Sequence, residues 1–274
     1  MNLPSSELIE RIERSERMYM YDRMQAIQQR EGNPEGVELE WFGSALCIYS
    51  KTMPWASFNT VKGIQANQLQ DLDRILSFYQ DRGRKFQFEI IPSLVNAELL
   101  QELAARGFYQ SGFHNSMYIH SDDRRQVWKG TADTDDVEIR RLAADEFESY
   151  ATIHCRATGL PDQGIPSVAR NNEVLYNRPD WRFYIAYVNK RPAAVAVMHV
   201  KEDAGSLTFA ATLPEYRRQR LHQAFIHRRI QDAAEEDASL VMGQCAFLSQ
   251  SHRNMEAAGM KIGYVRTTWT AAGS

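Results

Sequence analysis

The sequence has few cysteines, and no two of them lie at a spacing that binds metal. Cys47, Cys155 and Cys245 are odd in number and far apart. Structural zinc sites and disulfide frameworks need clustered or evenly paired cysteines. These absences argue against both classes and predict reduced thiols in a cytoplasmic protein.

Long apolar runs and an excess of charge of one sign are also missing. No stretch approaches the roughly 18 apolar residues of a membrane helix, and the opening MNLPSSELIERIERSERM is charged where a signal peptide has an apolar core. A formal net charge of -3 gives the chain no general attraction for nucleic acid or anionic membranes. We therefore expect neither partner, and any anion site must be local.

Helix-like and strand-like segments alternate along the chain. In the first half we expect a helix up to about residue 29, strands at ALCIYSK and FQFEIIP, and helices at 67–85 and 96–108. In the second half, three strand-like runs, WRFYIAYVN, RPAAVAVMHVK and GSLTFAATL, precede a long helix. This order predicts an α/β (α+β) fold with mixed sheets. A polar stretch divides it into residues 1–125, a linker at 126–136, and residues 137–274.

The two halves align without a gap at a shift of 152 residues. The helix at 67–85 falls on 219–237, and Gly107 falls on Gly259. Identities are sparse, so a chance likeness of two α/β halves stays open, but the shared order of elements favours a duplication. Only the second copy carries an arginine cluster, which assigns the chemistry to the C-terminal half.

That cluster lies in TLPEYRRQRLHQAFIHRRI, residues 212–230. A strand that ends at a helix start brings free backbone N–H groups and the positive end of the helix dipole together. Arg217, Arg218 and Arg220, followed a turn later by Arg228 and Arg229, add donors suited to phosphate. A strand edge beside such a site suits a cofactor with an amide arm and a pyrophosphate, and coenzyme A is one. A nucleic-acid patch is the alternative, although no aromatic residues interleave with the arginines.

The same residues resemble the GNAT N-acetyltransferase superfamily, whose signature here is [R/Q]-x-x-G-x-[G/A] after a strand and a proline. Arg217 matches the first position, whereas Arg220 and His222 stand at the two small-residue positions. A second segment, SQSHRNMEAAGMKIGYVRTTW, is similar to the end of many such proteins. The resemblance spans residues 206–269 and implies two GNAT-like sandwiches in tandem, the first of them degenerate.

The resemblance also implies acetyl-CoA wedged between two strands that separate. The pantetheine arm would pair with the strand end and the pyrophosphate would lie on the loop and first helical turn. An arginine Cβ at a glycine position restricts close approach and a positive φ. The cofactor contacts that it implies are Ala211, Thr212, Leu213, Arg217, Arg218, Gln219, Arg220, Leu221, His222, Gln223, Ser249, Ser251 and Asn254.

The residues expected to catalyse acetyl transfer are less clear. Many family members have a tyrosine acid where this chain has Met255. Tyr264 is the nearest replacement and His199 is a candidate base, although a half-buried strand tyrosine and a structural histidine are the alternatives. The resemblance implies an acetyltransferase acting on a small-molecule or protein amine. A homodimer is a further expected partner arrangement. A non-catalytic acyl-CoA sensor or partner-binding domain is the alternative function.

Overall fold

The computed structural model describes residues 3–121 and 136–272. The chain divides into two units, Met1–Ser116 with Ile262–Ser274, and Met117–Lys261. Nearly all of the predicted linker at 126–136 lies outside the described residues. The end of the chain groups differently from the predicted division at 137–274, because the last strand pairs with a strand of the first unit.

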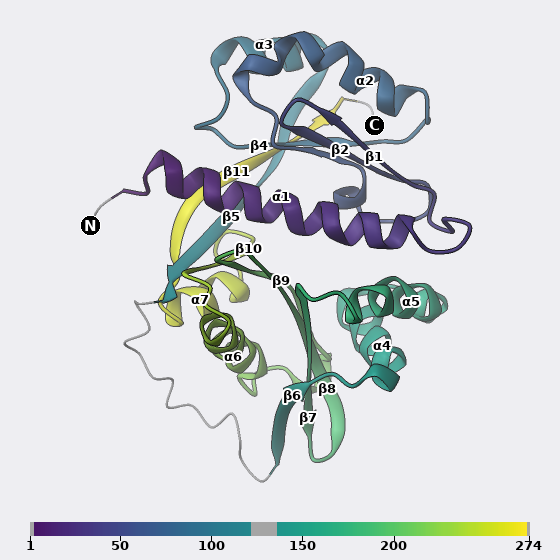
Figure 1. Ribbon diagram of the computed structural model, residues 1–274, viewed down its shortest axis with the longest axis vertical. Coiled ribbons are helices and arrows are strands. Elements are labelled where there is room, and N and C mark those ends of the chain that lie inside the picture. The colour runs from purple at the N-terminus through teal and green to yellow at the C-terminus, as the bar shows by residue number, and fades with distance from the viewer. Residues whose placement is uncertain (1–2, 122–135, 273–274) are drawn as a thin grey trace. The chain divides into compact units, whose positions relative to one another are not determined.

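The first unit is a mixed sheet with helices on both faces. Its strand order is β1-β2-β3-β4-β11-β5, and α2 and α3 cover one face while α1 covers the other (Figure 1). Most pairs are antiparallel, whereas β3 and β4 are parallel. The elements are α1 (Ser6–Gln28), β1 (Val37–Phe42), β2 (Ala45–Ser50), β3 (Thr60–Lys62), α2 (Leu72–Gln80), β4 (Gln87–Ile90), α3 (Ala97–Ala105), β5 (Phe108–His120) and β11 (Lys261–Ala271).

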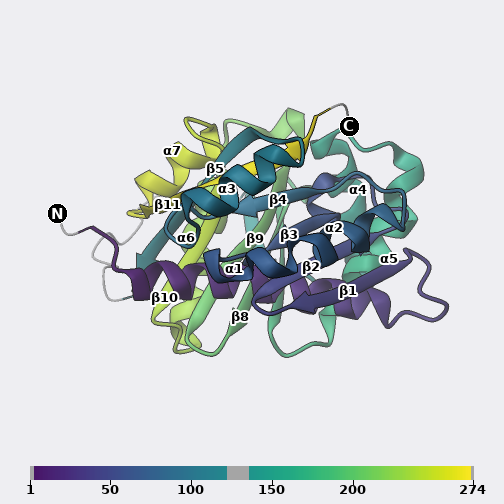
Figure 2. The same cartoon turned by 90° about the horizontal axis from the view of Figure 1, so that it is seen from above.

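The second unit is likewise a mixed sheet with helices on both faces, and strands β7 to β9 are longer than β1 to β3. Its strand order is β5-β10-β9-β8-β7-β6, with α6 and α7 on one face and α4 and α5 on the other (Figures 1 and 2). The last residues of β5 belong to this unit. The elements are β6 (Val137–Arg141), α4 (Phe147–Thr158), α5 (Ile165–Tyr176), β7 (Trp181–Val188), β8 (Arg191–Lys201), β9 (Ala204–Thr212), α6 (Leu221–Glu235), β10 (Leu240–Cys245) and α7 (Gln250–Ala257). The mixed α/β fold is as predicted.

The elements of the two units keep the spacing found in the sequence. A shift of 152 residues carries α3 (Ala97–Ala105) onto α7 (Gln250–Ala257) to within one residue at the start. Gly107 and Gly259, which follow these helices, both adopt positive φ angles of 83° and 88°. A glycine without Cβ strain ends each helix and lets the next strand begin.

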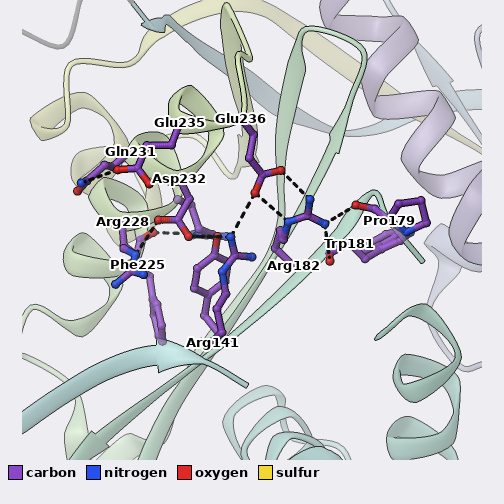
Figure 3. Close-up of polar contacts among 12 residues, drawn as sticks. Arg141, Pro179, Trp181, Arg182, Phe225, Arg228, Gln231, Asp232, Glu235 and Glu236 are labelled. Carbon is purple, nitrogen blue, oxygen red and sulfur yellow. Dashed lines mark hydrogen bonds and ion pairs between the residues drawn. The ribbon is translucent and has the colours of Figure 1, made fainter. Parts of the chain in front are cut away.

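A buried carboxylate network fixes α6 on the sheet of the second unit (Figure 3). Asp232 is 4% exposed and accepts hydrogen bonds from the Tyr184 hydroxyl at 2.8 Å and Arg228 Nε at 2.7 Å. Arg141 lies 3.0 Å away on β6, and Arg182 on β7 binds Glu236 through two nitrogens at 2.8 and 2.7 Å. The far end of α6 is thereby held against β6 and β7, which sets where its N-terminus lies.

The first unit buries a cluster of ionised side chains beside the β3–β4 pair. Glu89 contacts Lys62 and lies 2.8 Å from Arg266. These cations outweigh burial and lower the pKa of Glu89 to about 2. Burial instead raises the pKa of Glu13 to about 7. The space left inside the cluster is about 10 Å³, which is room for one water molecule.

The raised pKa of Glu13 makes the stability of the protein depend on pH. Between about pH 4.5 and 7 the folded state binds more protons here than the unfolded state, so stability falls as pH rises through this window. We expect Glu13→Gln to be more stable than wild type at pH 8, with the difference shrinking towards pH 5. Urea denaturation at both values measures this, with Glu10→Gln at an exposed position of the same helix as the control. An equal effect at both pH values would contradict the prediction.

No helix in the described ranges is both long enough and apolar enough to cross a membrane.

Candidate functional site

The second unit contains a cavity of about 730 Å³ where β9 separates from β10. The parallel pairing of these strands ends at Leu207 and Gly243, whereas the antiparallel pairing of β9 with β8 continues to Thr212. The last residues of β9 therefore have a strand neighbour on one side only. Ala210, Ala211 and Thr212 line the cavity, and their backbone can pair with an extended ligand.

The loop after β9 forms the next wall of the cavity. A short 3₁₀ turn, Pro214–Tyr216, follows the strand, and α6 starts at Leu221 with Arg220 as its N-cap. The N–H groups of the first turn of a helix have no partner within that helix, and they point towards its positive dipole end. Arg217, Arg218 and Arg220 line the cavity beside them. This wall is suited to an anion.

Two arginines of this loop have left-handed backbone conformations. The φ angle is 66° at Arg218 and 59° at Arg220, and Arg220 stands where the GNAT signature has glycine. A side chain other than glycine costs about 1–2 kcal/mol in this conformation. The loop therefore keeps the backbone geometry that glycine favours, although its residue carries a Cβ.

Replacing Arg220 by glycine should relieve this strain. We expect Arg220→Gly to stabilise the protein by about 0.5–1 kcal/mol. Glycine removes the strain of the positive φ angle from the folded state, and this gain exceeds the conformational entropy that glycine adds to the unfolded chain. The matched control is Arg217→Gly, since Arg217 has an extended conformation with φ of -65°. The free energy of unfolding of this variant should fall by about 0.5–1 kcal/mol. Urea denaturation distinguishes the two, and equal losses in both variants would show that Arg220 is not strained.

A chain of side-chain hydrogen bonds connects α6 to α7 across the cavity wall. Asn254 Nδ2 lies 2.8 Å from His222 Nδ1, and Asn254 Oδ1 accepts from Gln250 Nε2 at 2.9 Å. Since an amide nitrogen only donates, His222 Nδ1 is the acceptor and Nε2 carries the hydrogen. Burial and the charge of Arg229 lower the pKa of His222 to about 4, so the ring is neutral at pH 7.

The structure brings together most of the predicted cofactor contacts. Leu213, Gln219 and Ser249 do not line the cavity; Ser249 instead caps α7 by accepting from the His252 N–H at 3.1 Å. The predicted residues that line it are Ala211, Thr212, Arg217, Arg218, Arg220, Leu221, His222, Gln223, Ser251 and Asn254.

Sequence reasoning missed five lining residues: Ala157, Thr158, Ala210, Tyr216 and Gln250. Ala157 and Thr158 end α4, where their sequence signals only a helix terminus before Gly159. Gln250 lies in the SQSHRN segment, but a glutamine side chain gave no reason to predict a contact with the cofactor. Arg217 reaches across to the Ala157 carbonyl at 3.4 Å.

Arg228 and Arg229 were predicted to serve phosphate, and neither lines the cavity. Arg228 is paired with Asp232. Arg229 is 1% exposed and donates to backbone carbonyls. The prediction for these two residues was wrong, because Arg228 binds a carboxylate of its own helix and Arg229 points into the sheet.

The two predicted catalytic residues lie away from the cavity lining. His199 is 1% exposed, packs against Trp181 at 4.8 Å between ring centroids, and pairs with Ser206. Because Ser206 and Thr212 are six residues apart, His199 is roughly 20 Å along the sheet from the strand end. Tyr264 belongs to the first unit, where its buried hydroxyl donates to Glu16 at 2.9 Å. Both side chains are buried: Tyr264 is 8% exposed and so lies deeper than the half-buried strand tyrosine that was its alternative, and His199 is not solvent-facing.

Met255 occupies the core in place of the expected tyrosine acid. It is 3% exposed, and a Cβ at Gly243 would lie only 3.0 Å from its terminal methyl group. Within residues 3–121 and 136–272, none of the residues lining the cavity is Asp, Glu or Cys; apart from the arginines, the titratable side chains among them are Tyr216 and His222. No group of His, Cys, Asp and Glu within the described residues is suited to a metal ion.

Part of the second unit is similar to a known protein family. Residues 121–243 match the family model of the acetyltransferase (GNAT) domain. This segment, which is slightly less than half of the chain, is therefore similar to the acetyltransferase domain of GNAT proteins. No curated protein matches the sequence.

Solved structures share the fold over most of the chain. A GCN5-related N-acetyltransferase from Kribbella flavida is 15% identical with a TM-score of 0.65, covering 92% of this chain and 96% of that one. A functionally unknown conserved protein from Staphylococcus epidermidis is 15% identical with a TM-score of 0.60, covering 86% and 94%. A tandem GNAT protein from the clavulanic acid biosynthesis pathway is 16% identical with a TM-score of 0.58, covering 73% and 68%. The fold is therefore that of GNAT proteins, including a tandem one.

Proposed function

We propose that the protein is an N-acyltransferase that uses acetyl-CoA and acetylates an amine in the cavity of the second unit. The observation that carries this proposal is the junction of a one-sided strand end, Ala210 to Thr212, with an arginine-rich helix start in a GNAT domain. An amide arm fits the strand edge, and a pyrophosphate fits the helix start. A cavity of about 730 Å³ lies within the range of ligand sites.

The residues present suit this cofactor. Arg217, Arg218 and Arg220 would hold the phosphates together with the first-turn N–H groups of α6. His222 would donate from Nε2, and the edge of β9 would align the amide arm. The thioester, when bound, supplies an activated acyl group. The chain's contribution is to orient it and to provide N–H donors where negative charge develops.

The cavity predicts how the reaction depends on pH. The attacking amine must be neutral, and among the described residues that line the cavity there is no carboxylate to remove its proton. His222, with a pKa of about 4, is a weak base at neutral pH. The rate should therefore rise with pH and follow the ionisation of the amine acceptor itself. Rates for two amines that differ in pKa measure this, and a shared inflection between pH 6 and 7 would point instead to a protein base.

We infer that the first unit is a degenerate copy that does not bind the cofactor. Its β3–β4 pair corresponds to β9–β10, and its parallel pairing covers only Thr60 with Gln87 and Val61 with Phe88. Just beyond these pairs, Lys62, Glu89 and Arg266 fill the position where the second unit has its cavity. The conserved spacing of the two units supports a duplication followed by this loss.

A second candidate function is an acyl-CoA sensor or partner-binding domain without catalysis. It is favoured by Met255 in the core at the position of the family's acid. It is also favoured by the lack of a carboxylate among those lining residues that the structure describes. In that case the cavity binds acetyl-CoA, and the acyl group stays on the thiol.

Calorimetric titration with acetyl-CoA, followed by a thiol-release assay against a panel of small amines and peptide amines, separates these functions. We expect binding and amine-dependent thiol release. Binding without release across the panel would favour the sensor. No binding at about 1 mM acetyl-CoA, which corresponds to a free energy of only about -4 kcal/mol, would contradict both.

A further inference from the structure

Arg229 on α6 is a fully buried cation held by backbone carbonyls. It is 1% exposed, and its Nε donates to the Phe225 carbonyl at 3.0 Å. Its Nη1 donates to the carbonyls of Val197 at 2.9 Å and Phe209 at 3.0 Å. In the part of the chain that the structure describes, no carboxylate lies within ion-pair distance of this guanidinium, whereas the adjacent Arg228 is paired with Asp232.

The charge of Arg229 persists despite its burial. Burial lowers its pKa to about 10, which still leaves the guanidinium protonated at neutral pH. A buried charge without a counter-ion is costly, and a hydrocarbon of the same volume often stabilises a core better. Stability alone therefore does not explain an arginine at this position.

The carbonyls of Val197 and Phe209 place the Arg229 side chain close to the point where β9 separates from β10. Val197 and Phe209 face each other across β8 and β9, and the register shifts directly after Val197. The guanidinium donates to both carbonyls beside this irregularity, and the Val197 carbonyl also lies 3.5 Å from the Thr208 hydroxyl. Phe209 comes two residues after Leu207, the last residue paired with β10, and directly before Ala210 in the cavity wall.

Arg229 also acts on the helix end of the cavity. His222 precedes it by seven residues, which is two helical turns, so both lie on one face of α6. Long helical side chains lean towards the N-terminus, and the bond from Nε to Phe225 shows that Arg229 does so. Its charge adds to burial in lowering the pKa of His222, which keeps Nε2–H of the neutral ring available as a donor.

We propose that Arg229 is a positioning residue of the acyl-CoA site, fixing the backbone of β9 where it leaves β10 and holding His222 as a neutral donor. It touches neither the cavity nor the reacting atoms. It acts through two elements, the strand end and the first turn of α6, that both line the cavity. The role in binding rests on the proposed function, whereas the role in placing β9 and His222 does not.

Two variants test this proposal in the ligand-free protein first. Arg229→Gln removes the charge, and Arg229→Lys keeps it but cannot reach three carbonyls at once. Proton NMR titration measures the pKa of His222. His227 is the internal control, since burial alone lowers its pKa. We expect the His222 pKa to rise in Arg229→Gln and to stay near wild type in Arg229→Lys, while His227 is unchanged in both. Amide exchange should become faster at residues 209–212 in both variants.

Calorimetric titration then measures the affinity of each variant for acetyl-CoA. We expect about a tenfold loss of affinity in Arg229→Gln and a smaller loss in Arg229→Lys. The proposal would be overturned if Arg229→Gln had the same His222 pKa and the same amide exchange rates as wild type. If that variant does not fold, the proposal would be overturned by Arg229→Lys having wild-type exchange rates at residues 209–212 and wild-type affinity for acetyl-CoA. If wild type itself does not bind acetyl-CoA, the proposed function fails, and the ligand-free titration and exchange still decide the role of Arg229.

Discussion

Replacing Arg217 and Arg218 together by alanine is expected to weaken acetyl-CoA binding about 100-fold. Both side chains line the cavity beside the start of α6. A charge-assisted hydrogen bond to phosphate contributes roughly 1.5 kcal/mol, and two of them give about 3 kcal/mol, or about a hundredfold in Kd. The free energy of unfolding should change little, because both residues lie at the surface of the loop and the contact of Arg217 with Ala157 is long, at 3.4 Å.

Calorimetry of the double variant measures this loss. Lys201→Ala is the matched control, because it removes a partly exposed positive charge at the opposite end of the β8–β9 pair, where Lys201 faces Ala204. Raising the salt concentration should narrow the difference between wild type and the double variant, since salt screens exposed charges. Affinity within threefold of wild type in the double variant would mean that the arginines are only a solvated helix start.

Asp232→Ala is expected to destabilise the second unit by about 2–4 kcal/mol. This carboxylate is 4% exposed and accepts from Tyr184 and Arg228 while lying 3.0 Å from Arg141 (Figure 3). Its removal leaves a buried hydroxyl and two arginines without their shared partner, which costs more than the loss of an exposed ion pair. Because both arginines are partly exposed to solvent, the loss should stay below that of a fully buried pair.

Urea denaturation followed by circular dichroism measures this effect. Glu235→Ala is the control, since Glu235 lies in the same last turns of α6 and contacts only Gln231 in Figure 3, at 3.0 Å. We expect that variant to lie within about 0.5 kcal/mol of wild type. Asp232→Asn should lose less than Asp232→Ala, because the amide oxygen still accepts from Tyr184. Equal stability of Asp232→Ala and Glu235→Ala would show that the network does not hold α6.

Local sequence patterns predicted most elements because their physical causes are local. The apolar spacing of α6, Ser249 before α7 and Gly259 after it each determine a helix or its end within a few residues. The strand–proline–arginine order likewise predicted the loop that borders the cavity. Contacts that join distant segments had no local signal: nothing around Ala157 indicates that the end of α4 lies beside Arg217.

The predicted catalytic residues show the same limit. Tyr264 and His199 were chosen for their chemistry, and the structure buries both, one against Glu16 and the other against Trp181. Arg229 was predicted, together with Arg228, to bind phosphate, because both follow the arginine loop within about two helical turns. Adjacent residues of a helix point about 100° apart, so Arg228 turns to Asp232 while Arg229 turns into the sheet.

The sequence by itself therefore determined the order of elements, the position of the arginine loop, and the resemblance of the C-terminal half to GNAT proteins. Each follows from short-range periodicity, capping and turn chemistry. Only the tertiary structure decided that β9 leaves β10 after Leu207, that β11 joins the first unit, and that Arg229 lies behind the cavity wall. Strand pairing and burial depend on residues far apart in the chain, and no single segment encodes them.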